Sequence, residues 1–160
     1  MDAPDPAADV VATLTARGQL LATAESLTGG LLGAAITAVP GASAAYVGGV
    51  VAYATPMKHR LAGVDAELLE TQGPVSERTA MALAAGIREA TAADWAVATT
   101  GVAGPTSQDG HEPGEVWVAI VGPGVAARAV RYDFTGGRSA VRAATVRAAL
   151  ALLAGALGAQ

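Results

Sequence analysis

Hydrophobic positions along the chain follow two periodicities, and these predict alternating helices and strands. Apolar residues near helical spacing predict helices, whereas short apolar runs bounded by glycine, proline or polar residues predict buried strands. Gly18 suits a C-terminal cap, and Asp65 and Ser76 suit N-terminal caps. Thr55 suits an N-cap with Pro56 at the first helical position. Helices are therefore predicted over residues 8–17, 31–38, 65–71, 77–92 and 138–157, with a further helix beginning at Thr55-Pro56.

Five strands are predicted between these helices, over residues 20–24, 46–53, 95–99, 116–121 and 126–134. The last two form an antiparallel pair, because a Gly-Pro-Gly turn at residues 122–124 joins them. The alternation of strands and helices predicts an α/β fold, a three-layer α/β/α sandwich whose mixed sheet is mostly parallel with one antiparallel pair. A length of 160 residues fits one domain over residues 1–160, with residues 1–7 as a flexible lead-in.

The composition narrows the classes of function. Alanine is the commonest residue, and the aromatics are three tyrosines, two tryptophans and one phenylalanine, so the core is predicted to pack from small aliphatic side chains. The net charge of −4 and the lack of a basic tract argue against binding to DNA or RNA. The chain has no cysteine and only two histidines, so neither a metal site nor a cofactor is expected.

The first ten residues and the lengths of the apolar stretches indicate where in the cell the protein is expected. Glycine, proline or charged residues interrupt the apolar stretches before about 18–20 residues, so no membrane span is expected. The acidic first ten residues lack the basic region of a signal peptide, which predicts a cytoplasmic protein.

The candidate functional residues lie in the segments directly after the strands that are predicted to be parallel. Open α/β sheets bind ligands beyond the carboxyl ends of such strands. Residues 25–30, 53–58 and 100–114 come directly after three of them. Ser26 lies in the first segment, where a hydroxyl near a helix N-terminus and backbone N–H groups can act as a nucleophile. A plain N-cap role for Ser26 or Thr28 explains the same pattern.

A serine nucleophile needs a base, and Lys58 is the leading candidate. It is the only lysine in a chain whose other basic residues are all arginine. A buried lysine can lose its proton, which an arginine cannot do. His59 and His111 are weaker candidates, since the first adjoins Arg60 and the second lies in a polar loop. A surface lysine at a helix start is the alternative interpretation.

Three further features could serve such a site. Tyr53 ends its strand five residues before Lys58, and its hydroxyl could orient the lysine or relay a proton, although it could also be an ordinary strand-end tyrosine. The glycines of residues 100–105 could bring backbone N–H groups close to an anion, or could form an ordinary turn. Arg138 begins a helix, a place that favours phosphate or carboxylate, whereas Arg142 and Arg147 are expected on the outer face.

Six motifs occur in a fixed order over residues 8 to 157: AESLTGG, VVAYATPMKHRLAGV, GPVSERTA, TTGVAGP, GEVWVA and FTGGRSAVRAATVRAAL. In this order the chain resembles the CinA C-terminal domain family, in its standalone form, whose enzymatic members are nicotinamide-nucleotide amidohydrolases (NMN deamidases). The resemblance implies a three-layer α/β/α domain that hydrolyses the carboxamide of nicotinamide mononucleotide to nicotinate mononucleotide and ammonia, without a metal or cofactor.

The resemblance also implies roles for individual residues. The family's serine, tyrosine and lysine match Ser26, Tyr53 and Lys58, which implies a Ser-Lys mechanism assisted by tyrosine. Substrate binding falls to the turn after the serine, to the TG-x-AGP loop and to the arginine of the F-x-G-x-R motif, which correspond here to Thr28, Gly29, Gly30, Thr100, Gly101, Ala103, Gly104 and Arg138.

Residues 106–114 depart from the family pattern. Relatives carry a lysine in this segment, and here the lysine is replaced near His111, which bears on substrate affinity or specificity. Three alternatives to the deamidase therefore stay open: a non-catalytic nucleotide-binding module, a protein-interaction domain of the competence or damage-inducible type, and an amidase for another pyridine or nucleotide amide. The alanine-rich final helix could cover the sheet or pack against another subunit, so a homo-oligomer, such as a dimer, is expected.

Overall fold

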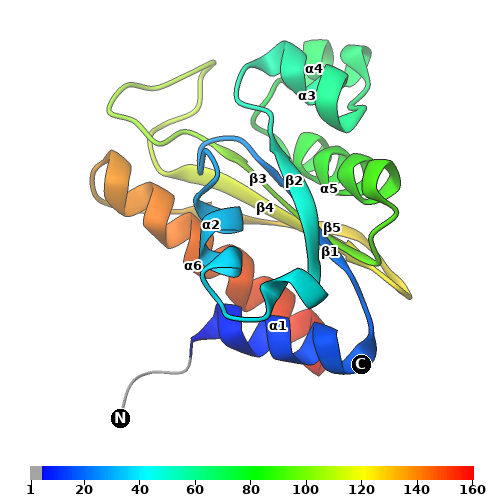
Figure 1. The fold of residues 1–160 in the computed structure, drawn as a ribbon. Helices are drawn as coiled ribbons and strands as arrows, with labels where there is room; N and C mark the ends of the chain where they lie inside the picture. Colours follow the sequence, from blue (N-terminus) through cyan, green and yellow to red (C-terminus); the bar gives the residue numbers. More distant parts are fainter. Residues whose placement is uncertain (1–4) are drawn as a thin grey trace.

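The computed structural model describes residues 5–160, and it shows an α/β fold built around one five-stranded sheet (Figure 1). The helices are α1 (Pro6–Arg17), α2 (Leu31–Thr37), the short 3₁₀ helix η1 (Ala42–Ala44), α3 (Thr55–Ala62), α4 (Ala66–Gln72), α5 (Glu77–Thr91) and α6 (Arg138–Gly158). The strands are β1 (Leu21–Glu25), β2 (Tyr46–Val51), β3 (Trp95–Gly101), β4 (Glu115–Gly122) and β5 (Val125–Asp133).

The predicted elements are all present, and two helix starts differ from the prediction. Helix α1 begins at Pro6 rather than at residue 8, because the Asp5 carboxylate caps it by accepting from the Ala7 N–H at 3.0 Å. Within the predicted lead-in 1–7, residues 1–4 lie outside the described residues. Helix α3 has extended Ala54 as its N-cap, so Thr55 is its first helical residue rather than its cap. Pro56 still falls in the first turn, where its missing N–H breaks no helical bond.

The strands are ordered β2-β1-β3-β4-β5, and only β4 runs against the others. The sheet is therefore mixed and mostly parallel, as predicted. It contains two antiparallel pairings rather than one, because β4 lies between β3 and β5 and pairs with both. No helix separates β3 from β4, so the chain cannot make the crossover that a parallel pairing requires and returns antiparallel along β3.

Helices cover both faces of the sheet, which makes the three layers of the predicted sandwich. Larger aliphatic side chains of the strands, such as Leu21, Val97 and Ile120, pack against α1, α2 and α6. Alanines of the same strands, such as Ala22, Ala96 and Ala119, pack against α3, α4 and α5. Because alternate residues of a strand face opposite sides, both faces are buried. Helices α3 and α4 lie beyond the carboxyl ends of β1 and β2, at the top of Figure 1.

Helix α6 is long and apolar enough to cross a membrane by length and composition alone, with a mean hydropathy of 1.5. In the fold it packs instead against α1 and the sheet, and it buries side chains that include Val141, Leu150 and Leu153. Its apolar face therefore belongs to the core of this domain.

Candidate active site

The carboxyl ends of β1, β2 and β3 meet at one edge of the sheet, and the segments that follow them enclose a cavity of about 260 Å³. Predicted site residues from all three segments line it, together with the start of α6. They are Ser26 after β1, Tyr53 and Lys58 after β2, Thr100, Gly101, Ala103 and Gly104 in and after β3, and Arg138. The structure therefore brings together side chains that are far apart in the sequence.

The turn that carries Ser26 connects β1 to α2. The Ser26 N–H donates to the Thr99 carbonyl at 3.1 Å, which extends the pairing of β1 with β3 by one residue. The Ser26 carbonyl accepts from the Gly29 N–H at 3.0 Å and closes a tight turn, in which Gly29 and Gly30 have positive φ angles of 59° and 105°. The Ser26 side chain is 7% exposed and faces the cavity.

Lys58 lies on the first turns of α3 and points into the protein with an exposed fraction of 1%. Its Nζ donates to the Ala52 carbonyl at 2.8 Å and to the Tyr53 carbonyl at 3.3 Å. The third neighbour of Nζ is the Ser26 Oγ at 3.1 Å. The nucleophile and base candidates are therefore within hydrogen-bond distance, although 32 residues separate them.

Burial lowers the pKa of Lys58 to about 8 from its ordinary value of 10.5, because removal from water disfavours the charged ammonium. Within residues 5–160, no carboxylate forms an ion pair with Lys58 that would restore the charged form. The charged lysine donates to all three oxygens, and the loss of one proton leaves two donors for the carbonyls and a lone pair that can accept the Ser26 hydroxyl proton. The site can therefore hold a base of moderate strength beside a hydroxyl.

Tyr53 lines the cavity, but its hydroxyl has a different partner from Lys58. Its hydroxyl accepts from Arg138 Nη2 at 3.0 Å, and only its backbone carbonyl contacts Lys58. The hydroxyl therefore does not orient Lys58 by direct contact, and its role as a proton relay stays a prediction. Arg138 Nη1 also donates to the Gly104 carbonyl at 2.8 Å, so this guanidinium bridges the β2 exit and the loop after β3.

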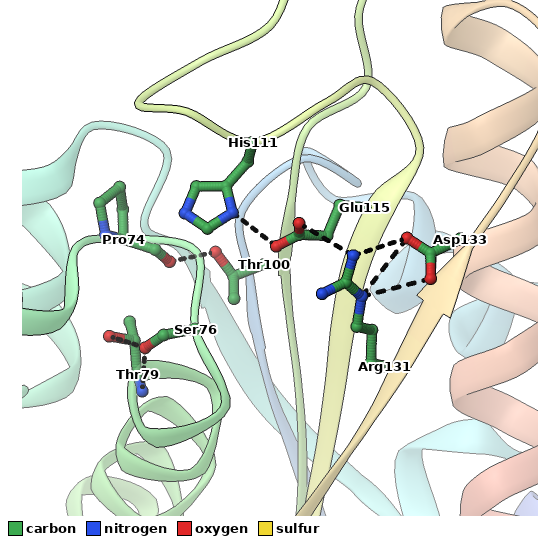
Figure 2. Close-up of polar contacts among 8 residues, drawn as sticks. All are labelled: Pro74, Ser76, Thr79, Thr100, His111, Glu115, Arg131 and Asp133. Atoms are coloured by element: carbon green, nitrogen blue, oxygen red, sulfur yellow. Dashed lines mark hydrogen bonds and ion pairs between the residues drawn. The ribbon is translucent and has the colours of Figure 1, made fainter.

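The loop after β3, residues 102–114, forms one wall of the cavity through Thr106, Ser107 and Gln108. At its far end His111 Nδ1 lies 2.6 Å from the Glu115 carboxylate, which also pairs with Arg131 at 3.2 Å (Figure 2). Figure 2 also shows the Thr100 hydroxyl donating to the Pro74 carbonyl at 2.6 Å. The side chain of Thr100 therefore holds the segment before α5 beside β3.

Three residues predicted to bind substrate do not line the cavity. Thr28 is fully buried, and its hydroxyl lies 2.9 Å from the Thr99 hydroxyl rather than facing the cavity. Gly29 and Gly30 shape the turn behind Ser26. Because the N-terminal amides of α2 are already bonded to Glu25, this helix end is not available to an anion.

Two residues were missed by sequence reasoning. The Glu25 carboxylate is buried and accepts from the N–H groups of Gly30, Leu32 and Gly33 at 2.9–3.2 Å. Arg142, expected on the outer face, donates to the Leu27 and Thr28 carbonyls at 2.9 and 3.2 Å. A charged residue inside an apolar strand, and an arginine one turn after Arg138, are the signals that could have indicated both. Arg147 is exposed, as expected.

Metal ligands do not gather in the part of the chain that the structure describes. Among residues 5–160, no three His, Asp or Glu side chains lie close enough together to hold a metal ion.

Comparisons with known proteins agree with this architecture. A CinA-like protein from Parasynechococcus marenigrum is 48% identical over 143 residues, and one from Anaeromyxobacter sp. is 50% identical over 145 residues. These alignments cover 88% and 90% of this chain but only 34% and 35% of the relatives. The chain thus spans about a third of the length of these curated relatives.

Solved structures match over the whole domain. A CinA superfamily protein from Klebsiella pneumoniae has a TM-score of 0.93 at 38% identity, with 98% of both chains covered. A competence/damage inducible protein from Agrobacterium tumefaciens has a TM-score of 0.90 at 34% identity, with 99% of this chain and 98% of that one covered. The CinA C-terminal domain matches residues 4–157. The match extends over nearly the whole sequence and confirms the resemblance, so this chain belongs to the CinA family.

Proposed function

We propose that this protein is an amidase that hydrolyses nicotinamide mononucleotide to nicotinate mononucleotide and ammonia, with Ser26 as nucleophile and Lys58 as general base. The observation that carries the proposal is the 3.1 Å contact between Ser26 Oγ and a fully buried Lys58 Nζ. A lysine that is buried without a carboxylate partner is costly to keep charged, and this cost is useful when the neutral amine is the reactive form.

Acylation begins when Ser26 Oγ attacks the carbon of the substrate carboxamide and Lys58 takes the hydroxyl proton. The carboxamide oxygen becomes negative, and the N–H of Leu27, next to the nucleophile, is the closest donor in sequence for it. Within residues 5–160 this N–H donates to no other protein group, so it is free to do so. Lys58 then returns the proton to the amide nitrogen, the C–N bond breaks, and ammonia leaves an ester on Ser26.

Deacylation repeats these steps with water in place of the serine. Lys58 takes a proton from a water molecule, whose oxygen attacks the ester carbon. The C–O bond to Ser26 breaks, and the serine oxygen regains a proton from Lys58. The products are the pyridine carboxylate and the free enzyme, with no metal or redox step.

The phosphate of the nucleotide is assigned to the other end of the cavity. Arg138 uses two donors on Tyr53 and Gly104, and a guanidinium has five, so further donors remain for an anion. Ala103 lines the cavity, and its N–H makes no bond to another protein group among the described residues. Both groups suit a mononucleotide phosphate or its ribose hydroxyls.

The test measures ammonia release from nicotinamide mononucleotide by the purified protein in the presence of a chelator. The wild type is expected to turn over, whereas Ser26→Ala and Lys58→Arg are expected to lose activity by about 1,000-fold or more. Lys58→Arg is the sharper variant, since it keeps the charge but cannot act as a base near neutral pH. Turnover within a few-fold of wild type in either variant would exclude the dyad.

The substrate is tested separately from the dyad. A panel of pyridine and nucleotide amides compares nicotinamide mononucleotide with nicotinamide and with nicotinamide riboside, which lack the phosphate. Preference for the mononucleotide supports the proposal, and equal turnover of all three points to an amidase of another specificity. Tight binding of the mononucleotide without ammonia release identifies a nucleotide-binding module instead.

A further inference from the structure

Helix α6 contributes two arginines, one turn apart, that contact the segments around the cavity, and Arg138 is the one that lines it. Arg138 contacts the Tyr53 hydroxyl and the Gly104 carbonyl, as described above. Arg142 contacts the turn after β1 instead, through the carbonyls of Leu27 and Thr28. One helical surface therefore joins all three segments that follow the parallel strands.

Arg142 binds the turn in a way that orients it. Its Nε donates to the Leu27 carbonyl at 2.9 Å and its Nη2 to the Thr28 carbonyl at 3.2 Å, so two atoms of one rigid plane fix two successive peptide groups. The first of these peptide groups joins the Leu27 carbonyl to the Thr28 N–H. Leu27 also carries the N–H that directly follows the nucleophile in the chain. A fixed guanidinium thus restrains the backbone on the chain segment directly after Ser26.

The charge of Arg142 has no acidic partner to explain it. Within residues 5–160, no carboxylate forms an ion pair with this residue, which is half-buried. Its hydrogen bonds to carbonyl groups are charge-assisted and stronger than neutral ones. They cross 114 and 115 residues of sequence, so they tie the turn to a separate element.

We propose that Arg142 is a positioning residue, which holds the Ser26 turn in the orientation that keeps Ser26 Oγ at hydrogen-bond distance from Lys58 Nζ. The proposal rests on the proposed acyl-transfer function. It assigns to Arg142 a role in the rate of attack by Ser26, not in substrate binding, since Arg142 does not line the cavity. A misplacement of about 1 Å at a reacting group costs about 100-fold in rate.

The experiment compares Arg142→Met and Arg142→Lys with the matched control Arg147→Met, an exposed arginine on the same helix. We expect kcat for ammonia release to fall about 100-fold in Arg142→Met with KM within about threefold of wild type. Lys can reach one carbonyl but not both, so kcat of Arg142→Lys is expected to be about tenfold higher than kcat of Arg142→Met. Arg147→Met is expected to match wild type.

A second readout separates this inference from the proposed substrate. The rate at which a fluorophosphonate probe labels Ser26 depends on the nucleophile and its base, not on the natural amide. We expect slower labelling of Arg142→Met, by about the same factor as kcat, in the fraction that circular dichroism and gel filtration show to be folded. Should Arg142→Met fail to fold, Arg142→Lys decides, with labelling slower than wild type expected.

Three results count against these proposals, and the measurements distinguish them. Labelling and kcat within about twofold of wild type in the Arg142 variants overturn the positioning role. A rise in KM with kcat unchanged overturns it as well, because that pattern marks a residue that binds substrate. Wild-type protein that reacts with the probe but releases no ammonia from the mononucleotide contradicts the proposed function and leaves the labelling comparison of Arg142 intact.

Discussion

The turn after β1 and the loop after β3 face the same cavity, but the fold holds them by different contacts. The turn, residues 26–30, is tied from three sides by the buried Glu25 carboxylate, by the Thr28–Thr99 hydroxyl pair and by Arg142. The loop, residues 102–114, is longer. Its outer part is held through His111, whose side chain is 28% exposed, and its inner end through Arg138.

These contacts indicate which part of the site is rigid. Buried, charge-assisted hydrogen bonds resist local opening, whereas contacts near solvent are weakened by water and salt. A nucleophile has to stay within a fraction of an ångström of its base, and Ser26, the proposed nucleophile, lies on the tightly held side. The loop that forms a wall of the cavity lies on the more loosely held side.

The largest expected effect comes from removing the buried tie at the start of α2. Glu25→Ala leaves three amides without their acceptor, and we expect the free energy of unfolding to fall by about 3–5 kcal/mol. The turn should loosen at the same time, so kcat should fall in the fraction that stays folded. Chemical denaturation followed by circular dichroism measures the first effect, and ammonia release measures the second.

The control for this variant is Glu70→Ala, which removes an exposed carboxylate from α4. We expect its unfolding midpoint to match that of the wild type. If Glu25→Ala behaves like Glu70→Ala, the tightly held turn is not a stabilised element and the comparison with the loop fails.

The next effect is the dependence of the rate on pH. Because burial lowers the pKa of Lys58 to about 8, the neutral base is scarce below pH 8 and predominates above it. The rate of Ser26 labelling by the fluorophosphonate probe should therefore rise about 50-fold from pH 6 to pH 8 and level off above pH 9. The probe avoids the substrate phosphate, which itself titrates near pH 6.

The direction in which the labelling rate changes with pH tests whether Lys58 is the base. A rate that is flat from pH 6 to pH 9, or that falls as the pH rises, would show that Lys58 does not act as the base. Recording circular dichroism spectra across the same range excludes unfolding as the origin of the change.

The smallest expected effect is on the loop. His111→Ala removes the contact with Glu115, and we expect KM for the mononucleotide to rise about fivefold with kcat nearly unchanged. The control Glu112→Gln alters the exposed neighbour and should leave both constants unchanged. An equal loss in kcat and no change in KM would mean that the loop takes part in alignment of the reacting groups and that the two regions do not differ as described.

Local patterns predicted most of the elements, because helix ends and strands depend on residues close in sequence. Asp65 and Ser76 cap their helices as predicted, and Gly18 ends α1 with a left-handed residue. The start of α1 was missed because Asp5 caps it from within the segment predicted to be flexible. The second antiparallel pairing was missed because a strand pattern does not name its neighbours.

Some features of the candidate site were likewise predictable from local sequence, and others were not. The order of the motifs, the lone lysine and the serine after a buried strand indicated Ser26 and Lys58 as candidates, and their catalytic roles stay a prediction. The partner of the Tyr53 hydroxyl, the burial of Thr28 and the role of Glu25 at the start of α2 were not predictable, since each depends on which side chain turns toward which neighbour.

Periodicity and helix caps act over a few residues, so the α/β class, the order of the elements and the residue types available for chemistry followed from local patterns alone. The packed fold, by contrast, sets the carboxyl ends of β1, β2 and β3 side by side, which brings Lys58 to 3.1 Å from Ser26 and removes it from water. It also placed Arg142 on the Ser26 turn from more than 100 residues away. Strand order and burial are properties of the whole packed chain, and the pKa of Lys58 follows from them.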